Sequence, residues 1–256
     1  MNARQLAPER MDRLREIVRG QRVVRVDVIG RQLGVSAATV RRDLLALERS
    51  GEVERVHGGA VSRGERVEEP LFDDKASLAP EEKRRIARAA LGLIRPDDTI
   101  YLDGGSTVLE LARLLRDRAR LTVVTNSLRA AQELAGGGPR LILAGGELRR
   151  LSQTMVGPLT RHLLEQVRVD RAFMGTIGLD LGTGMTTTDP GEAYTKSIVL
   201  ERAREIILLA DGSKIGRVSF ARAGGLERVR VLVTDRTADP AFLKAMARQG
   251  VRVLKA

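Results

Sequence analysis

The sequence predicts an α/β chain of two domains, a small one at residues 1–62 and a larger one at residues 81–256. In the first segment, apolar residues recur at helical spacing and a short hairpin pattern follows. In the second, apolar runs of strand length alternate with helical patterns, which indicates a parallel sheet. Residues 63–80 contain two prolines and many charges without periodicity, so we expect them to connect the domains.

The first domain begins with two predicted helices. Apolar residues recur every three or four positions over residues 8–19, which predicts a helix with one buried face, and Gly20 ends it. Asp27 is expected to cap a second, shorter helix, and Gly34 suits the left-handed position that ends it. Gly30 lies inside this second helix, where glycine costs about 1 kcal/mol. A tight turn therefore separates the second helix from a third.

The third helix combines a buried stripe with an exposed cationic face. Ser36 is expected to cap it, and its apolar residues lie at i, i+4 and i+7, so they share one face. Arg41 and Arg42 are turned partly or wholly away from that face, as is Thr39. The residues of the buried stripe are Val40, Leu44 and Leu47.

A hairpin pattern follows, and together these elements indicate a winged helix-turn-helix. Val53 and Val56 alternate with charged residues before a His-Gly-Gly turn. A helix-turn-helix places the start of its second helix in the DNA major groove, where arginine bonds guanine with two hydrogen bonds. The alternative is an ordinary solvated helix face in an arginine-rich protein. The candidate DNA-contacting residues are Ser36, Thr39, Arg41, Arg42, Arg55 and His57.

The composition favours duplex DNA as a partner and disfavours several other classes. A net charge of +11 favours nucleic acid, because bound cations release condensed counterions. Aromatic residues make up only 2%, too few for the stacking platforms of single-strand binders. The chain has no cysteine and two histidines, so we expect no metal site and no cofactor. Its apolar runs are far shorter than the roughly 18 residues of a membrane span, which predicts a cytoplasmic protein.

The second domain reads as alternating strands and helices from residue 81 onward. The pattern predicts a mainly parallel sheet with helices on both faces. Residues 178–197 have little hydrophobic pattern and are expected to form a mobile loop that enters a helix near Glu192 and closes over a ligand. Glu192 and Lys196 are spaced i, i+4, which fits either a helix salt bridge or a ligand contact. The predicted strands are TIYL, LTVVT, LILA, RAFMG, IILLA, VLVT and VRVL.

Glycine, hydroxyl and charged residues follow several of these strands. Ligands of open α/β sheets bind at the carboxyl ends of strands, and a helix N-terminus there favours an anion. Lys214 could neutralise a phosphate or bond a sugar hydroxyl. Each motif also has a structural interpretation, as a turn cap, a tight loop or a partner of backbone groups. The motifs are Asp103-Gly104-Gly105-Ser106-Thr107, Thr125-Asn126-Ser127, Gly145-Gly146 and Asp211-Gly212-Ser213-Lys214.

These residues carry a family resemblance along nearly the whole chain. VSAATVRRDLLALERSG, followed by ERVHGGAV, resembles the N-terminal signature of the DeoR family of bacterial transcriptional regulators. DGGST, TNS, AGG, VGP, DRAFMG, MTTTDPGEA and LADGSKIG resemble successive blocks of the family's C-terminal sensor domain. Where many members carry serine or a similar residue, this chain has Gly105 and Gly212.

The resemblance implies a winged helix-turn-helix repressor of sugar-utilisation genes. It implies a C-terminal α/β fold related to ribose-5-phosphate isomerase, a phosphorylated sugar as effector, and a homo-oligomer, dimer or tetramer. A second hypothesis is a sugar-phosphate isomerase or transferase with Asp103, Glu192 or Asp211 as general acid or base. A third is a constitutive architectural DNA-binding protein, which leaves the glycine-rich strand ends unexplained. The candidate effector-binding residues are Asp103, Gly104, Ser106, Thr107, Thr125, Asn126, Gly145, Gly146, Glu192, Asp211 and Lys214.

Overall fold

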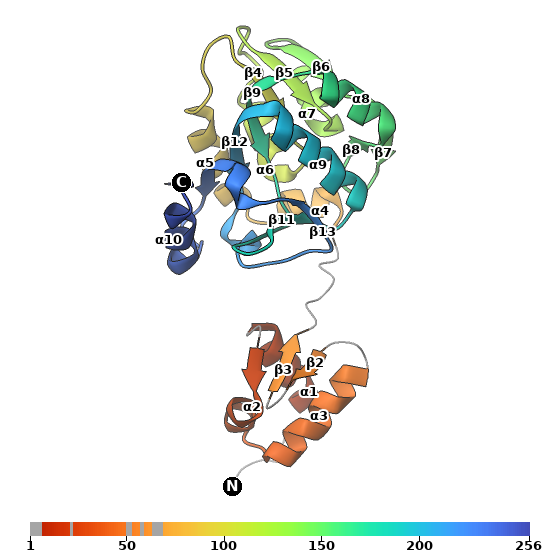
Figure 1. Ribbon diagram of the computed structural model, residues 1–256, viewed down its shortest axis with the longest axis vertical. Helices are drawn as coiled ribbons and strands as arrows, with labels where there is room; N and C mark the ends of the chain where they lie inside the picture. The colour runs from red at the N-terminus through yellow and green to blue at the C-terminus, as the bar shows by residue number, and fades with distance from the viewer. Residues whose placement is uncertain (1–6, 21–22, 50–52, 57–58, 63–68) are drawn as a thin grey trace. The chain divides into compact units, whose positions relative to one another are not determined.

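The computed structural model of the chain describes residues 7–20, 23–49, 53–56, 59–62 and 69–256 (Figure 1). It divides the chain into two compact units, Met1–Val67 and Glu68–Ala256. In the described part of the chain, no helix is long and apolar enough to cross a membrane.

The first unit is a helix-turn-helix with a small antiparallel sheet. The sheet has the strand order β1-β3-β2, in which β2 and β3 form the predicted hairpin. Strand β1, which the sequence pattern does not reveal, pairs with β3 on its other side. The elements are α1 (Ala7–Gly20), β1 (Val23–Arg25), α2 (Val26–Leu33), α3 (Ala37–Arg49), β2 (Val53–Val56) and β3 (Gly59–Ser62).

The predicted apolar stripe of the third helix forms part of the core of this unit. Val40, Leu44 and Leu47 are fully buried against residues of α1 and α2. Behind the stripe, Arg10 of α1 donates to both carboxylate oxygens of Asp43, at 2.7 and 3.2 Å. A bidentate arginine–carboxylate pair fixes orientation as well as distance. Helix α3 is therefore held rigidly from its inner side.

One detail of the second helix differs from the prediction. Asp27 does not cap it, because β1 runs directly into α2 and the N-cap position falls on Arg25, with no side-chain cap. Gly34 has φ = 66° and ends α2 as predicted. Close packing explains the glycine at position 30 of this helix, since a Cβ atom there would lie 3.0 Å from the carbonyl oxygen of Val35. The tight turn thus brings the Val35 carbonyl close enough to α2 that a side chain at position 30 would be tightly packed.

The second unit is built on a seven-stranded parallel sheet, as predicted. Its strand order is β15-β14-β12-β9-β4-β5-β6, so β4 and β9 are neighbours although far apart in sequence. The carboxyl ends of β4, β9 and β12 therefore lie side by side. The strands are β4 (Thr99–Leu102), β5 (Thr122–Thr125), β6 (Arg140–Leu143), β9 (Val169–Met174), β12 (Ala203–Leu209), β14 (Val229–Thr234) and β15 (Arg252–Lys255).

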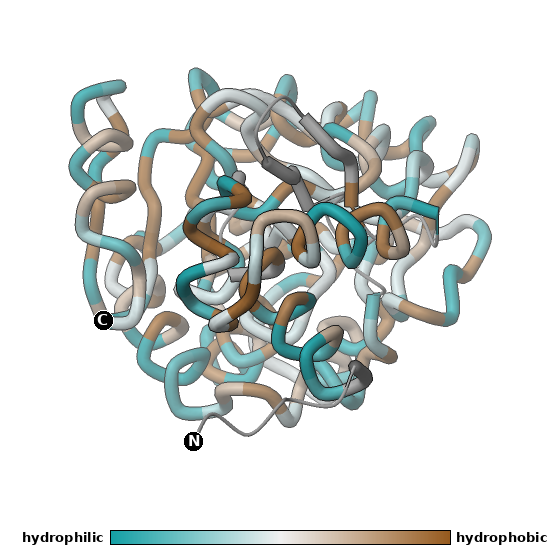
Figure 2. The backbone as a smooth tube through the Cα atoms, turned by 90° about the horizontal axis from the view of Figure 1, so that it is seen from below, coloured by the Kyte–Doolittle hydropathy of each residue, from teal (hydrophilic) through white to brown (hydrophobic). Residues whose placement is uncertain are grey.

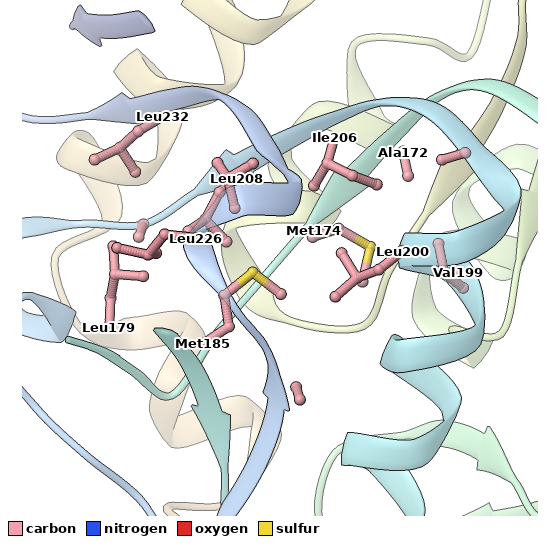
Figure 3. Close-up of a cluster of buried hydrophobic side chains, with 14 of the residues drawn as sticks. Ala172, Met174, Leu179, Met185, Val199, Leu200, Ile206, Leu208, Leu226 and Leu232 are labelled. Atoms are coloured by element: carbon pink, nitrogen blue, oxygen red, sulfur yellow. The ribbon is translucent and has the colours of Figure 1, made fainter. Parts of the chain in front are cut away.

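Helices and smaller sheets cover both faces of this central sheet. Strand β12 shows the arrangement, because Ile206 and Leu208 belong to one hydrophobic core and Ile207 and Leu209 to the other. Figure 3 shows the first core, where Leu200 of α9 lies near Ile206 and Met174. The helices are α4 (Phe72–Ser77), α5 (Pro80–Leu91), α6 (Ser106–Arg113), α7 (Leu128–Leu134), α8 (Pro158–Gln166), α9 (Pro190–Arg202) and α10 (Pro240–Arg248).

Hydropathy along the backbone follows this layering. Figure 2 shows helical turns that alternate between hydrophobic and hydrophilic residues, the pattern of helices with one buried face. The core strands are apolar on both sides, since parallel strands covered on both faces have no solvent side. Helices α5, α6 and α7 pack in one core, whereas α8, α9 and α10 pack in the other.

Short strands and 3₁₀ turns outside the central sheet complete the second unit. Residues 178–187, expected as a mobile loop, form a buried hairpin whose second strand also pairs with β13. The expected helix near Glu192 is α9. The hairpin was missed because its strands are short and rich in glycine and threonine. These extra elements are β10 (Gly178–Asp180), β11 (Gly184–Thr187), β13 (Ala221–Gly224), the hairpin of β7 (Glu147–Arg149) and β8 (Thr154–Val156), and the short 3₁₀ turns η1 (Gly212–Lys214) and η2 (Leu226–Arg228).

Part of the expected connection between the domains belongs to the second unit. Within residues 63–80, helix α4 packs against α6, and Glu69, Phe72 and Lys75 are buried. Pro70 and the acidic residues concealed this helix, which is only one and a half turns long and has no sequence periodicity to reveal it.

Candidate functional site

The start of α3 presents the predicted DNA-contacting residues on an exposed surface. The Ser36 hydroxyl accepts the backbone N–H of Thr39 at 3.2 Å and so caps the helix as predicted. Arg41 and Arg42 are exposed, and Thr39 is half-buried. The opposite face carries the buried Asp43 that Arg10 holds. The two arginines therefore project from a helix whose inner face is fixed.

Two of the predicted DNA-contacting residues belong to the wing. Arg55 lies on β2 opposite Ala60 of β3. His57 falls outside the described residues. The assignment of both residues to DNA contact remains a prediction.

The second unit contains a polar cavity at the carboxyl ends of β4, β9 and β12. Eight of the eleven predicted effector-binding residues line it, and they come from the three segments that follow β4, β5 and β12 and from α9. They are Asp103, Gly104, Ser106, Thr107, Asn126, Glu192, Asp211 and Lys214. The parallel sheet brings these residues together because each follows or faces a strand end at the same edge.

A buried ion pair lies at the centre of the cavity floor. Asp103 follows β4 directly, and its Oδ2 accepts the backbone N–H of Gly175, which follows β9, at 2.9 Å. The Lys196 ammonium of α9 donates to the same oxygen and, at 3.1 Å, to the carbonyl of Gly175. Burial raises the pKa of Asp103, and Lys196 opposes that rise. Of the two interpretations of the Glu192 and Lys196 spacing, the helix salt bridge is not formed, because Lys196 pairs with Asp103 instead.

Glu192 is held by hydroxyl groups and an arginine from neighbouring strands. Asp189 caps α9 by accepting the Glu192 N–H at 2.8 Å. The Glu192 carboxylate accepts from Thr187 at 2.9 Å and from Thr154 at 3.1 Å, and Arg149 lies 3.3 Å away. A carboxylate in such a setting has a fixed position and orientation.

Asn126 lines the cavity and also connects two elements of the fold. Its Oδ1 accepts the Tyr101 hydroxyl at 2.8 Å, and its Nδ2 donates to the Met155 carbonyl at 3.0 Å. One side of the amide therefore joins β4, and the other joins the β7–β8 hairpin to the sheet. These two hydrogen bonds limit rotation of the amide, which keeps one N–H and one oxygen lone pair for a further partner.

Lysines form the cationic part of the cavity. Of the 44 Lys and Arg residues six are lysines, and four of these six, Lys75, Lys83, Lys196 and Lys214, line it. The Lys83 ammonium donates to the carbonyls of Lys75 and Leu78. The Lys214 ammonium makes no hydrogen bond or ion pair with any residue that the structure describes. Burial lowers the pKa of both Lys83 and Lys214, and nearby Asp211 opposes this effect.

Three predicted residues lie outside the cavity lining. The Thr125 hydroxyl donates to the Leu102 carbonyl at 2.7 Å and accepts the Ser127 N–H at 3.0 Å. The Gly145 carbonyl accepts the Thr160 hydroxyl at 2.7 Å. Gly146 has φ = 150°, and a Cβ there would lie 2.1 Å from the Thr160 Oγ1. These residues satisfy backbone groups and allow close packing, which was their alternative interpretation.

Sequence reasoning missed Glu69, Lys75 and Lys83 as cavity residues. The first two lie in the segment expected to connect the domains, so they were not considered with the strand ends. The rarity of lysine was the available signal, because four of the six lysines in this arginine-rich chain lie around one cavity. Lysine is a compact point charge suited to phosphate, whereas arginine is a planar fork.

Comparisons with known proteins agree with both units. Residues 10–66 match the DeoR-like helix-turn-helix domain, and residues 78–236 match the DeoR C terminal sensor domain. The HTH-type transcriptional regulator GlpR of Haloferax volcanii is 36% identical over 97% of this chain and 98% of its own length. The lactose phosphotransferase system repressor of Staphylococcus epidermidis is 37% identical over 89% of this chain and 91% of its own.

Among solved structures, ribose 5-phosphate isomerase A of Methanocaldococcus jannaschii aligns with a TM-score of 0.40 and 22% identity, over 53% of this chain and 54% of that one. The two domain matches together span the helix-turn-helix unit and most of the unit with the lysine-lined cavity. The chain therefore belongs to the DeoR family of transcriptional regulators.

Proposed function

We propose that the chain represses carbohydrate-metabolism genes by binding operator DNA, and that a phosphorylated sugar in the lysine-lined cavity controls this binding. One observation carries the proposal. The cavity places Lys214, whose ammonium makes no ion pair with any described residue, beside hydroxyl groups and fixed carboxylates. This combination suits a ligand with a phosphoryl group at one end and sugar hydroxyls at the other.

The phosphoryl end is assigned to the side of the cavity with Ser106, Thr107, Lys83 and Lys214. Ser106 and Thr107 begin α6, whose first N–H groups and positive dipole end favour an anion. The Lys214 charge adds a hydrogen bond to a charged group, worth about 1.5–3 kcal/mol. Burial of the cation excludes water and strengthens its attraction for the anion.

The sugar end is assigned to the side with Asp103, Asn126 and Glu192. Carboxylate and amide oxygens accept hydrogen bonds from hydroxyl groups, and here their own positions are fixed by Lys196, Tyr101 and the threonines around Glu192. Fixed acceptors distinguish one arrangement of hydroxyl groups from another. The cavity would therefore select among phosphorylated sugars.

On the DNA side, Arg41 and Arg42 are assigned to base edges in the major groove. Thr39 and Ser36 are assigned to the phosphate backbone or adjacent bases, and Arg55 and His57 to the wing contact. Family membership supports this assignment, as does the exposure of both arginines on a helix whose inner face is held by Arg10 and Asp43.

We further propose that the protein acts as a homo-oligomer, dimer or tetramer, in the cytoplasm. Two helix-turn-helix units would read half-sites about one helical turn apart. The effector would change operator affinity only to the extent that it binds the DNA-competent and incompetent states differently. The lactose phosphotransferase system repressor is named as a repressor of sugar uptake, which supports this regulatory role.

The test is an operator-binding titration with the full chain. A duplex selected from random sequence serves as operator, and phosphorylated aldoses and ketoses are added with their unphosphorylated counterparts as controls. We expect at least one phosphorylated sugar, and no free sugar, to change operator affinity by about 5–150-fold, the usual size of allosteric coupling. Operator affinity unaffected by every compound would refute the effector assignment.

The enzyme hypothesis is tested with the same compounds. Asp103, Glu192 and Asp211 each have partners, Lys196, the threonines and Ser213 respectively, which supports a binding role over proton transfer. We therefore expect binding without turnover. Conversion of any aldose phosphate to its ketose by the purified chain, followed by NMR, would revive the isomerase.

A further inference from the structure

Glu69 is a buried carboxylate at the point where the second unit begins. Its side chain is 1% exposed, and both oxygens have cationic partners. Oε1 accepts from the Lys75 ammonium at 2.6 Å, and Oε2 lies 2.8 Å from the Arg149 guanidinium and also accepts the Thr188 hydroxyl. Burial alone would raise the pKa of Glu69, but Lys75, Thr188 and Arg149 together lower it. Glu69 is therefore an anion in the folded protein.

The partners of Glu69 are shared with the cavity. Lys75 lines the cavity together with Lys83, Lys214 and Glu69 itself. Arg149 also lies 3.3 Å from the cavity residue Glu192. The carboxylate of Glu69 is thus an internal anion that neutralises part of the cationic wall.

Glu69 also occupies a special position in the sequence. Only residues 63–68 separate it from Ser62, the last residue of β3 in the helix-turn-helix unit. Its ion pairs therefore fasten the end of the covalent connection to the wall of the cavity. A ligand that breaks the ion pair between Lys75 and Glu69 therefore acts at the end of this connection.

We infer that Glu69 is an intramolecular competitor of the ligand phosphoryl group, and that the bound ligand displaces its carboxylate from Lys75. This inference rests on the proposed function and names how the same site is regulated. A phosphate monoester carries a charge of about −1.5 to −2 at neutral pH, so it attracts the lysines more strongly than a single carboxylate does. Displacement loosens the segment from Glu69 through α4.

The inference predicts the opposite change in ligand affinity from a purely structural role for Glu69. If Glu69 only stabilised the cavity wall, its loss would weaken ligand binding. If it competes, removal of its charge increases the fraction of the protein that is ready to bind, and affinity rises by that factor. Glu69→Gln keeps the size and hydrogen-bonding atoms of the side chain and removes the charge.

The probe is inorganic phosphate, titrated calorimetrically into the full chain at constant ionic strength. We expect Glu69→Gln to bind phosphate about 3- to 10-fold more tightly than the wild type, the factor by which a competing state is removed. Glu81→Gln is the matched control, because Glu81 is an exposed carboxylate of α5 that pairs with Arg84 and does not line the cavity. This control is expected to leave phosphate affinity unchanged.

A second measurement uses the wild type alone and does not depend on the folding of a variant. Hydrogen exchange of the backbone amides in residues 71–77 is expected to rise on addition of phosphate. Equal or weaker phosphate binding by Glu69→Gln, unchanged exchange in the wild type, or no phosphate binding by either protein overturns the inference. If sugar phosphates bind Glu69→Gln more tightly than the wild type but do not change operator affinity, the proposed function is refuted and the competition by Glu69 still stands.

Discussion

Loss of the Lys196 ammonium is expected to leave a buried carboxylate without its cation. In Lys196→Met the Asp103 side chain, which belongs to a residue only 3% exposed, keeps the Gly175 N–H as its remaining partner. Removal of one member of a buried ion pair costs about 3–5 kcal/mol. For a unit the size of Glu68–Ala256, at about 2–4 °C per kcal/mol, the melting temperature should fall by about 6–20 °C.

The pH dependence of this loss has a definite sign. Burial raises the pKa of Asp103 in the folded protein, and loss of Lys196 removes the effect that opposes the rise. A carboxyl group with a raised folded pKa destabilises the fold when it is ionised, and the penalty disappears as pH falls below that pKa. The stability difference between Lys196→Met and wild type should therefore be larger at pH 8 than at pH 5.

Differential scanning calorimetry of the full chain at both pH values measures this difference. Lys244→Met, which removes an exposed lysine of α10, is the matched control and should change the melting temperature little. Asp103→Asn in the Lys196→Met background should restore part of the lost stability, because no buried charge remains. A melting temperature within about 2 °C of wild type, or a loss that is equal at pH 5 and pH 8, would contradict the reasoning.

Three further predictions follow from single contacts. Arg41→Ala or Arg42→Ala should weaken operator binding by about 5–150-fold and should weaken binding to a scrambled duplex much less. Fluorescence anisotropy at fixed salt measures both affinities, and equal losses would make that arginine a phosphate contact. Lys214→Met should weaken binding of the phosphorylated sugar about 10–100-fold by calorimetry. Wild-type affinity should fall as pH rises through the lowered pKa of Lys214; a flat alkaline profile would oppose its role. Gly30→Ala should fail to gain the about 1 kcal/mol by which alanine exceeds glycine in helix propensity, because its Cβ would lie 3.0 Å from the Val35 carbonyl oxygen; a first unit stabilised by that amount in denaturant unfolding would contradict this.

The sequence alone determined the elements whose signal is local. Local patterns predict the buried stripe of Val40, Leu44 and Leu47, the Ser36 cap and the Gly34 stop, and all appear in the structure. The seven strands of the parallel sheet are likewise apolar runs with turn residues after them. Periodicity and capping depend on neighbours within one or two turns, so one-dimensional information suffices.

Tertiary structure alone decided which charged groups meet. Asp103 pairs with Lys196 across 93 positions, whereas the i, i+4 spacing of Glu192 and Lys196 fitted either a helix salt bridge or a ligand contact. The same applies to Glu69 and Arg149, and to Lys75, which the sequence placed in a connection. The order of strands in the sheet brings these residues together, and no local pattern encodes that order. Long-range pairing therefore set the cavity's chemistry, while local spacing set the elements that carry it.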